Sequence, residues 1–453
     1  MSVRIITFIS FSLLFITAAS IFLFHYLIVG QAVYGDGIGY YSHLHSWVID
    51  HDWDYTNEYQ HIYGHENNNA ILPKKSPVIQ IVPTTSNGQA GNYYGPGVAL
   101  LLLPFYLLAH WVSLIANATG GHVSLSGYSD VYQIFSGLGA VMYAVLGLFF
   151  LERLLLFFSH QRLLSRLSVV MLFFATHLIY YGSFDVINSH FASFFLTALF
   201  FWIFFTQKKW GLRRDLILGL LAGLLAITRL QDGIVVLLWG VEIFLLWHQQ
   251  PIKKYLPVVK RIALFALAFG LAVLPLIWQW VLLFPDPTHQ PNIQVFINRY
   301  QSQHFPNVVG SLFHPVTGLF SRTPLLFILF GYWLFFRKTF PSRFKPALMY
   351  LFGFFFLQFL IITYQGGWFA AAYGGRMYIS SLLFFALLLV QLLHQLQKKY
   401  RAHYIFAGVF ICLNLFLMAH FILWEKGAEG GRRGTESRTL ERLSRFKLLS
   451  PID

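Results

Sequence analysis

Long apolar runs alternate with short polar segments along almost the entire chain. A helix needs roughly 20 mainly apolar residues to cross the core of a bilayer, and at that length the pattern predicts an all-α, polytopic membrane protein with about eleven transmembrane helices. We place these helices at residues 5–29, 131–152, 167–182, 191–207, 216–228, 233–248, 262–284, 323–336, 346–364, 378–397 and 403–424. The first run is too long for the apolar core of a signal peptide, which has about 7–15 residues, so we expect it to remain as a span.

One further apolar run, residues 98–116, is predicted not to cross the membrane. Basic residues favour the cytoplasmic side, and five basic clusters follow this run. They are Arg153, Arg162 and Arg166; Lys208, Lys209, Arg213 and Arg214; Lys253, Lys254, Lys260 and Arg261; Arg337, Lys338, Arg343 and Lys345; and Lys398, Lys399 and Arg401. All five lie on the side of Met1 only if the run, which has Pro104 near its middle, stays in the outer leaflet as a juxtamembrane helix.

The predicted topology places the N-terminus in the cytoplasm. Two long loops, residues 30–130 and 285–322, then face the outer, periplasmic side of the inner (plasma) membrane. Residues 1–424 form a single multi-pass domain. The basic tail 425–453 faces out, and its segment TLERLSRFKLLS has the spacing of an amphipathic helix that lies on the membrane surface.

Composition supports the membrane assignment. Of the 453 residues, 57% are hydrophobic and 11% are charged, whereas soluble domains carry about 25% charged residues. The net charge of +14 comes from clusters between spans, which indicates topology rather than a nucleic-acid surface. The single cysteine, Cys412, excludes an intrachain disulfide and a cysteine-based metal site.

The first carboxylate of the chain, Asp36, lies in VYGDGIGYYSHLHSW (residues 33–47), directly after the first predicted span. Gly35, Gly37 and Gly39 permit a sharp turn there. Asp is also a favourable residue at a helix N-terminus. Two interpretations of Asp36 therefore stay open: a helix cap, or an acid held at the membrane surface for chemistry.

Histidines and acids crowd the same loop and raise the question of a metal site. His43, His45 and Asp50 are the candidate ligands. Histidines two positions apart do not share a helix face, and no further ligand has a suitable spacing. The pattern therefore favours the absence of a metal.

Three arginines stand at the outer ends of predicted spans, against the cytoplasmic bias of basic residues. They are Arg229 in ITRLQDG, Arg322 in GLFSRTPLL and Arg376 in GGWFAAAYGGRMYIS. Each alone can extend to lipid head groups. Three together indicate a site for an anion, and the guanidinium fork suits a phosphate group. The segment DVINSH adds Asp185 and His190 at another outer junction.

These segments resemble those of one known family. GDGIGYY, DWDYTNEY and YYGPGVALLLLPFYLL resemble the first outer loop of glycosyltransferases of the GT-C fold, in particular the bacterial relatives of protein mannosyltransferases and of the lipid A aminoarabinose transferase. SHFASFF, ITRLQDG, GLFSRTPLL and GGWFAAAYGGR resemble later segments of the same family in the same order. The resemblance extends over most of the chain.

The resemblance implies an integral membrane enzyme that transfers a sugar from a polyprenyl-phosphate-linked donor to a protein, lipid or cell-wall acceptor on the outer face. It further implies inversion at the anomeric carbon and no metal or cofactor. Asp36 takes the place of the family's acid that deprotonates the acceptor. Many members carry an acid pair at this point, whereas Gly37 follows Asp36 here, so the assignment rests on one acid. The expected substrate-binding residues are Tyr40, Tyr41, Asp54, Tyr94, His190, Arg229, Arg322 and Arg376.

Two functions of other classes are the alternatives: a flippase for a polyprenyl-linked sugar or another transporter, and a non-catalytic assembly subunit. A transporter is expected to carry charges deep within its spans and helices that break at mid-membrane. Here the polar residues gather in two outer loops and at the ends of spans. The pattern favours transfer over transport.

The predicted topology can be tested with reporter fusions. Fusions after Lys209, Lys254, Lys338 and Lys399 are expected to report the cytoplasm, and fusions at Asn68 and Asn307 the outside, because basic clusters remain inside. A cytoplasmic signal at Asn307 would mean that residues 98–116 cross the membrane, and the candidate site residues would then lie on both of its sides.

Overall fold

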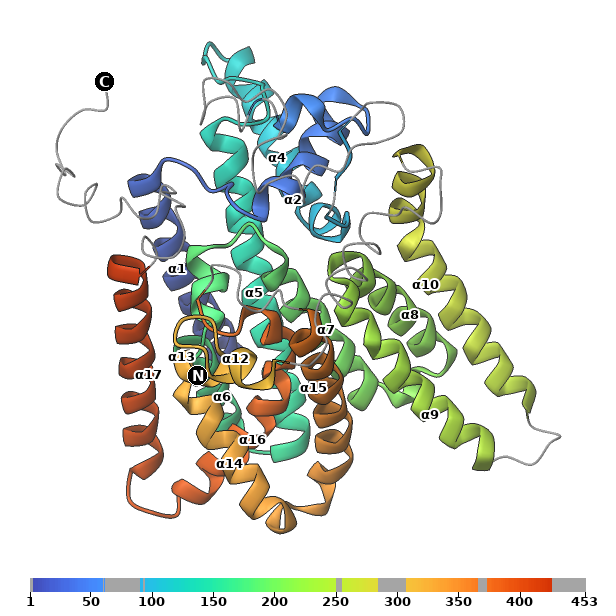
Figure 1. Ribbon diagram of the computed structural model, residues 1–453, viewed down its shortest axis with the longest axis vertical. Helices are drawn as coiled ribbons and strands as arrows, with labels where there is room; N and C mark the ends of the chain where they lie inside the picture. The colour runs from blue at the N-terminus through green and yellow to red at the C-terminus, as the bar shows by residue number, and fades with distance from the viewer. Residues whose placement is uncertain are drawn as a thin grey trace.

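The computed structural model describes residues 3–59, 61, 90–92, 94–249, 255–283, 307–365 and 373–425, and its regular elements within these ranges are helices (Figure 1). The α-helices are α1 (Val3–Val29), α2 (Gly37–His45), α4 (Gly97–Ala118), α5 (Asp130–Ser159), α6 (Arg162–Phe174), α7 (Ser189–Thr206), α8 (Leu212–Thr228), α9 (Val235–Gln249), α10 (Tyr255–Leu283), α12 (Val308–Phe313), α13 (Leu319–Arg322), α14 (Pro324–Phe336), α15 (Lys345–Gln365), α16 (Leu382–Leu396) and α17 (Ala402–His420). Short π-helical segments, η1 (Ser46–Asp50), η3 (Tyr180–Phe184) and η12 (Phe421–Glu425), and 3-10 segments, among them η5 (Leu230–Ile234) and η11 (Arg376–Ser381), join them. The predicted tail helix and parts of both predicted outer loops lie outside the described residues.

Nine helical segments within the described ranges are long and apolar enough to cross a membrane. They are Arg4–Val29, Gly97–Ala118, Asp130–Ser159, Ser189–Thr206, Leu230–His248, Leu256–Leu283, Ser342–Tyr364, Arg376–Leu396 and Ala402–Leu423. Eight of them coincide with predicted spans, so the chain is a helical, multi-pass membrane protein. The other three predicted spans fall on shorter helices, since α6 and α14 have 13 residues each and α8 has 17. The total of eleven therefore stays a prediction.

The one segment that matches no predicted span is α4, which contains the run predicted to lie in the outer leaflet. Figure 1 shows α2 and α4 together at the upper end of the view, beside the start of α5. α4 packs along the first turns of α5, where His110 Nδ1 lies 2.6 Å from the Tyr132 hydroxyl. Its other face exposes apolar side chains, among them Trp111 at 69% and Ile115 at 58%. α4 thus offers one face to the protein and one to its surroundings, as a helix at a membrane surface needs; whether it crosses stays a prediction.

The centre of the bundle consists of α7 and α16, whose side chains are almost all buried. Phenylalanine rings fill the space around them, and the outer helices α9, α10 and α17 keep exposed apolar faces. Close helix contact in a membrane depends on small residues. Gly219 and Gly223 of α8 provide it, because a Cβ on either would collide with atoms of α10.

Buried charges in α8, α9 and α10 are paired. Arg214 donates to Glu242 at 2.7 Å, and Arg261 donates to the fully buried Asp215 at 2.7 Å. These pairs connect α8, α9 and α10 near the basic clusters that are predicted to face the cytoplasm. Ion pairs therefore hold α8, α9 and α10 together in this region.

Candidate functional site

The site begins at the turn between α1 and α2. Gly35 has φ of +57°, a left-handed conformation that glycine adopts without steric cost. Asp36 follows at the N-cap position of α2, but its side chain makes no capping hydrogen bond. The helix-cap interpretation of Asp36 is therefore wrong for its side chain, which points to other partners.

The carboxylate of Asp36 lies between two donors from distant parts of the chain. Tyr94 donates its hydroxyl to Asp36 Oδ1 at 2.9 Å, and Arg376 donates Nη1 to Asp36 Oδ2 at 2.9 Å. The side chain of Asp36 is 36% exposed and that of Arg376 is 16% exposed. The acid is thus held in a defined orientation and still has access to a ligand.

Glycines in the same motif allow other segments to pack closely against the start of α2. A Cβ on Gly37 would collide with the Ile187 carbonyl, and a Cβ on Gly39 would collide with the ring of Tyr94. Tyr94 also packs against Tyr40, with ring centroids 4.6 Å apart. Burial, with a further contribution from the charge of Asp36, raises the pKa of Tyr94 well above its ordinary value. Its hydroxyl therefore keeps its proton and acts as a donor to Asp36.

A second arginine stands next to this pair. Arg229, which is 8% exposed, donates Nη1 to His190 Nδ1 at 3.3 Å and Nη2 to Met377 Sδ at 3.0 Å. A guanidinium group only donates, so His190 accepts with an unprotonated Nδ1 and is neutral in this contact. Arg229 also interacts electrostatically with Arg376 and Asp36, so the two guanidinium groups lie near each other.

A buried acid that the sequence analysis did not select supports Arg229. Asp232, fully buried, accepts hydrogen bonds from Ser193 (2.5 Å), Ser380 (2.8 Å) and Gln358 (2.7 Å). Its backbone N–H donates to the Arg229 carbonyl at 2.8 Å. Asp232 therefore ties α7, α15 and η11 to the turn that carries Arg229. The available signal was an acid at the outer end of a predicted span, in ITRLQDG.

Six of the nine residues expected to form the site come together: Asp36, Tyr40, Tyr94, His190, Arg229 and Arg376. The other three make different contacts. Tyr41 is fully buried and donates to the Gly127 carbonyl at 2.7 Å. Asp54 accepts from the backbone and hydroxyl of Thr56, which holds a local turn. Arg322 donates to the Pro315 carbonyl at 2.5 Å and borders Gly374, two residues before Arg376.

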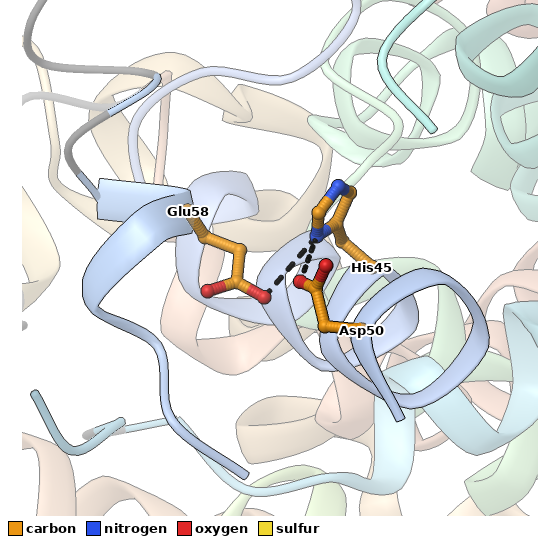
Figure 2. Close-up of side chains that lie close together, drawn as sticks. All are labelled: His45, Asp50 and Glu58. Atoms are coloured by element: carbon orange, nitrogen blue, oxygen red, sulfur yellow. Dashed lines mark hydrogen bonds and ion pairs between the residues drawn. The ribbon is translucent and has the colours of Figure 1, made fainter. Parts of the chain in front are cut away.

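The candidate metal ligands of the first outer loop divide into two groups. His45 Nδ1 lies 2.8 Å from Asp50 Oδ2 and 3.2 Å from Glu58 Oε1 (Figure 2). His43 instead lies between the Tyr55 hydroxyl (2.8 Å) and the Tyr94 carbonyl (2.9 Å), and burial lowers its pKa to about 4. Of the candidate ligands weighed from the sequence, His45 and Asp50 therefore lie together with Glu58, and His43 lies apart from them.

Charge and burial act against each other in this cluster. Burial by itself lowers the pKa of His45, but the hydrogen bond to Glu58 and the charges of Asp50 and Glu58 raise it above its ordinary value. Burial raises the pKa of Glu58 to about 7, against the opposing effect of His45. The cluster is therefore a place where positive charge is stabilised.

Comparisons with known proteins identify no family. No protein-family model matches the sequence, and no curated protein matches it. Among solved structures, the chain is similar to the archaeal oligosaccharyltransferase AglB from Archaeoglobus fulgidus in complex with an inhibitory peptide and a dolichol-phosphate, with 11% identity and a TM-score of 0.43 over 88% of this chain and 54% of that one. The chain thus spans about half the length of that protein. The likeness is too distant to support a conclusion about activity, which has to be inferred from the residues around Asp36.

The contact between Gly39 and Tyr94 generates a first structural prediction. Gly39→Ala places a methyl group where the Tyr94 ring lies, and overpacking of this kind costs about 1–3 kcal/mol. Thermal unfolding in detergent is expected to show a lower midpoint for this variant. Gly240→Ala is the matched control, since nothing lies within 4 Å of a Cβ there. Equal midpoints for the two variants would contradict the packing of Tyr94 over Gly39.

Proposed function

We propose that this protein is a GT-C-type glycosyltransferase that moves a sugar from a polyprenyl-phosphate-linked donor to an acceptor on the outer face of the membrane, with inversion. The observation that carries the proposal is the pairing of Asp36 with Arg376, next to Arg229, at the outer ends of the predicted spans. An acid and two cations at one place provide what this reaction needs: a base for the acceptor and a site for the donor phosphate.

The arginines bind the phosphate in the proposed reaction. When the glycosidic bond breaks, the sugar becomes oxocarbenium-like and negative charge grows on the departing phosphate. Fixed cations next to that phosphate stabilise the transition state more than the bound donor. Arg376 and Arg229 are the principal candidates. Arg322 is a further candidate, because it borders the segment that carries Arg376.

Asp36 is the base in the proposed reaction. Its Oδ2 accepts a hydrogen bond from Arg376. A donor phosphate competes for this guanidinium group, and the transfer of Arg376 to the phosphate frees Oδ2. The acceptor oxygen or nitrogen then attacks the anomeric carbon from the face opposite the phosphate, its proton passes to Asp36, and polyprenyl phosphate leaves. Donor binding in this scheme releases the base only when a sugar is in place.

The polyprenyl tail requires an apolar surface beside the site. The exposed apolar face of α4 is the proposed wall, because α4 starts directly after the Gly95–Pro96 turn that follows Tyr94. Transport is less well supported. Four of the buried charged residues, Arg214, Asp215, Arg229 and Asp232, lie at or next to the two ends of α8, whereas a transporter is expected to place charges at mid-membrane.

The role of Asp36 can be tested with one isosteric substitution. Asp36→Asn keeps the size of the side chain but cannot accept a proton near neutral pH. General base catalysis contributes about 10²–10⁴-fold, so transfer of a radiolabelled sugar from lipid to acceptor in detergent should fall by at least about 100-fold. Donor lipid should still co-purify, because the variant leaves Arg376 without its carboxylate partner and open to phosphate.

The control for this variant is Asp130→Asn, an exposed acid at the start of α5 that accepts from Tyr26. It is expected to keep full activity. Full activity of a folded Asp36→Asn protein would contradict the catalytic role of Asp36. Asp52, Asp54 and Asp185 would then be the next acids to examine.

Arg376 is predicted to act on the donor. Arg376→Gln removes a charge-assisted hydrogen bond worth about 1.5–3 kcal/mol, so kcat/KM for the donor should fall by about 10-fold or more. Arg376→Lys should recover part of this loss, since the charge returns but the bidentate fork does not. Arg213→Gln, an exposed arginine that stacks on Trp210, is the control. Wild-type activity of Arg376→Gln at limiting donor would place the phosphate elsewhere.

A further inference from the structure

The cluster of His45, Asp50 and Glu58 lies at the opposite end of α2 from Asp36. His45 is the last residue of α2, Asp50 is the last residue of η1, and Glu58 belongs to the helical turn at residues 56–59. His45 comes nine positions after Asp36, which is roughly 13 Å along a helix. A group bound at this cluster is therefore separate from the atoms that react in the proposed transfer.

The partners of His45 determine its protonation. Nε2 of His45 lies 2.9 Å from the Ser126 carbonyl, which only accepts hydrogen bonds, so Nε2 carries a proton. Nδ1 then faces two carboxylate oxygens at 2.8 Å and 3.2 Å, as Figure 2 shows. A nitrogen lone pair and two carboxylates repel one another. A proton or a metal ion has to lie between them, and the proton is carried either by His45 Nδ1 or by Glu58, whose pKa burial raises to about 7.

A proton balances this cluster incompletely. One N–H or O–H group points well at only one acceptor, so a single proton leaves Nδ1 and the two close carboxylate oxygens incompletely paired. Glu58 is fully buried, and its Oε2 has no hydrogen-bond partner. A buried carboxylate oxygen without a partner is unfavourable. A divalent cation would neutralise both carboxylates and offer a positive charge close to the unpaired oxygen.

We propose that His45, Asp50 and Glu58 bind a divalent transition-metal ion of the zinc class. The three ligand atoms lie within 4.8 Å of one another. Zinc binds imidazole nitrogen and carboxylate oxygen at about 2.0–2.2 Å, which in a tetrahedron sets ligand atoms roughly 3.4 Å apart, so shifts on the order of 1 Å complete the site. Water takes the fourth position. The proposal departs from the sequence-based expectation of no metal.

The surroundings of the three ligands have the features of a metal site. A ligating histidine usually donates its second N–H to a carbonyl or carboxylate, and His45 faces the Ser126 carbonyl in this way. Asn57 donates to Asp50 Oδ2 at 2.9 Å and orients that carboxylate. The ion joins the end of α2, η1 and the turn at residues 56–59. Its role is to hold the first outer loop, and α2 with it, in place.

The test measures metal content in the full-length protein, purified in detergent with an affinity tag that lacks histidine. After removal of metals with a chelator, zinc chloride is added, unbound zinc is removed, and the bound metal is counted by mass spectrometry. Wild-type protein is expected to retain about one zinc per chain and to unfold at a higher temperature with zinc than without it. Glu58→Gln and Asp50→Asn should bind zinc at least about 10-fold more weakly, since even the loss of a residue that only orients a ligand costs about 10–100-fold.

The control variant is His51→Asn. His51 lies next to Asp50 but points its Nδ1 to the Trp47 carbonyl, and Asn tolerates the left-handed backbone found there. It should bind zinc like the wild type. Equal zinc binding by wild type, Glu58→Gln and Asp50→Asn would overturn the proposal and leave a proton, on His45 or Glu58, between the three groups.

A measurement on the wild type alone decides the question if the ligand variants do not fold. X-ray absorption at the zinc edge of the loaded protein is expected to show one imidazole nitrogen and oxygen ligands at about 2.0–2.2 Å. A shell with two or more imidazoles, or with water only, would show that zinc binds elsewhere and would refute the site.

Discussion

The ion pair between Asp36 and Arg376 is the contact on which the candidate site of this protein depends. It joins the turn after the first helix to a segment 340 residues later in the chain. An unpaired charge in a half-buried position is costly. Each of the two residues therefore stabilises the fold that brings the other within hydrogen-bond distance. Arg376 is followed by Met377, which contacts Arg229, and Arg229 precedes the turn that Asp232 fixes among α7, α15 and η11. The pair therefore connects the turn after α1, through η11, to the turn that carries Arg229.

Close packing makes this pair possible. In a membrane, apolar surface does not drive helices together as it does in water, and small residues decide where backbones approach. Gly37 lies against the Ile187 carbonyl, and Gly39 lies under the Tyr94 ring. The motif GDGIGYY therefore combines an acid with the small residues that let other groups reach it. Gly219 and Gly223 have the same function between α8 and α10.

The two ends of α2 carry clusters with different physical character. At its start, the Asp36 side chain is 36% exposed, and it accepts from Tyr94 and Arg376, two donors that a substrate can displace. At its end, Glu58 is fully buried and one of its oxygens has no partner. An accessible, exchangeable pair suits a reaction, whereas a largely buried cluster with excess negative charge suits a resident cation. A single short helix therefore links a candidate reactive centre with a candidate structural one.

The amino-acid sequence by itself determined the helical, multi-pass character of this protein, because a bilayer requires each span to be apolar and to satisfy its own backbone hydrogen bonds, which is a local property. It also singled out Asp36, Arg229 and Arg376, since charges at the outer ends of apolar runs stand out against their surroundings. It indicated correctly that His43 and His45 face different ways, because the helix period separates positions two apart. Only the tertiary structure decided which of these residues meet. Glu58, and not His43, lies beside His45, and the backbone N–H of Asp232 donates to the Arg229 carbonyl. Tyr41 donates to the Gly127 carbonyl, whereas Tyr40 packs against Tyr94. These outcomes depend on how helices far apart in the chain pack, and residue spacing along one segment does not contain that information.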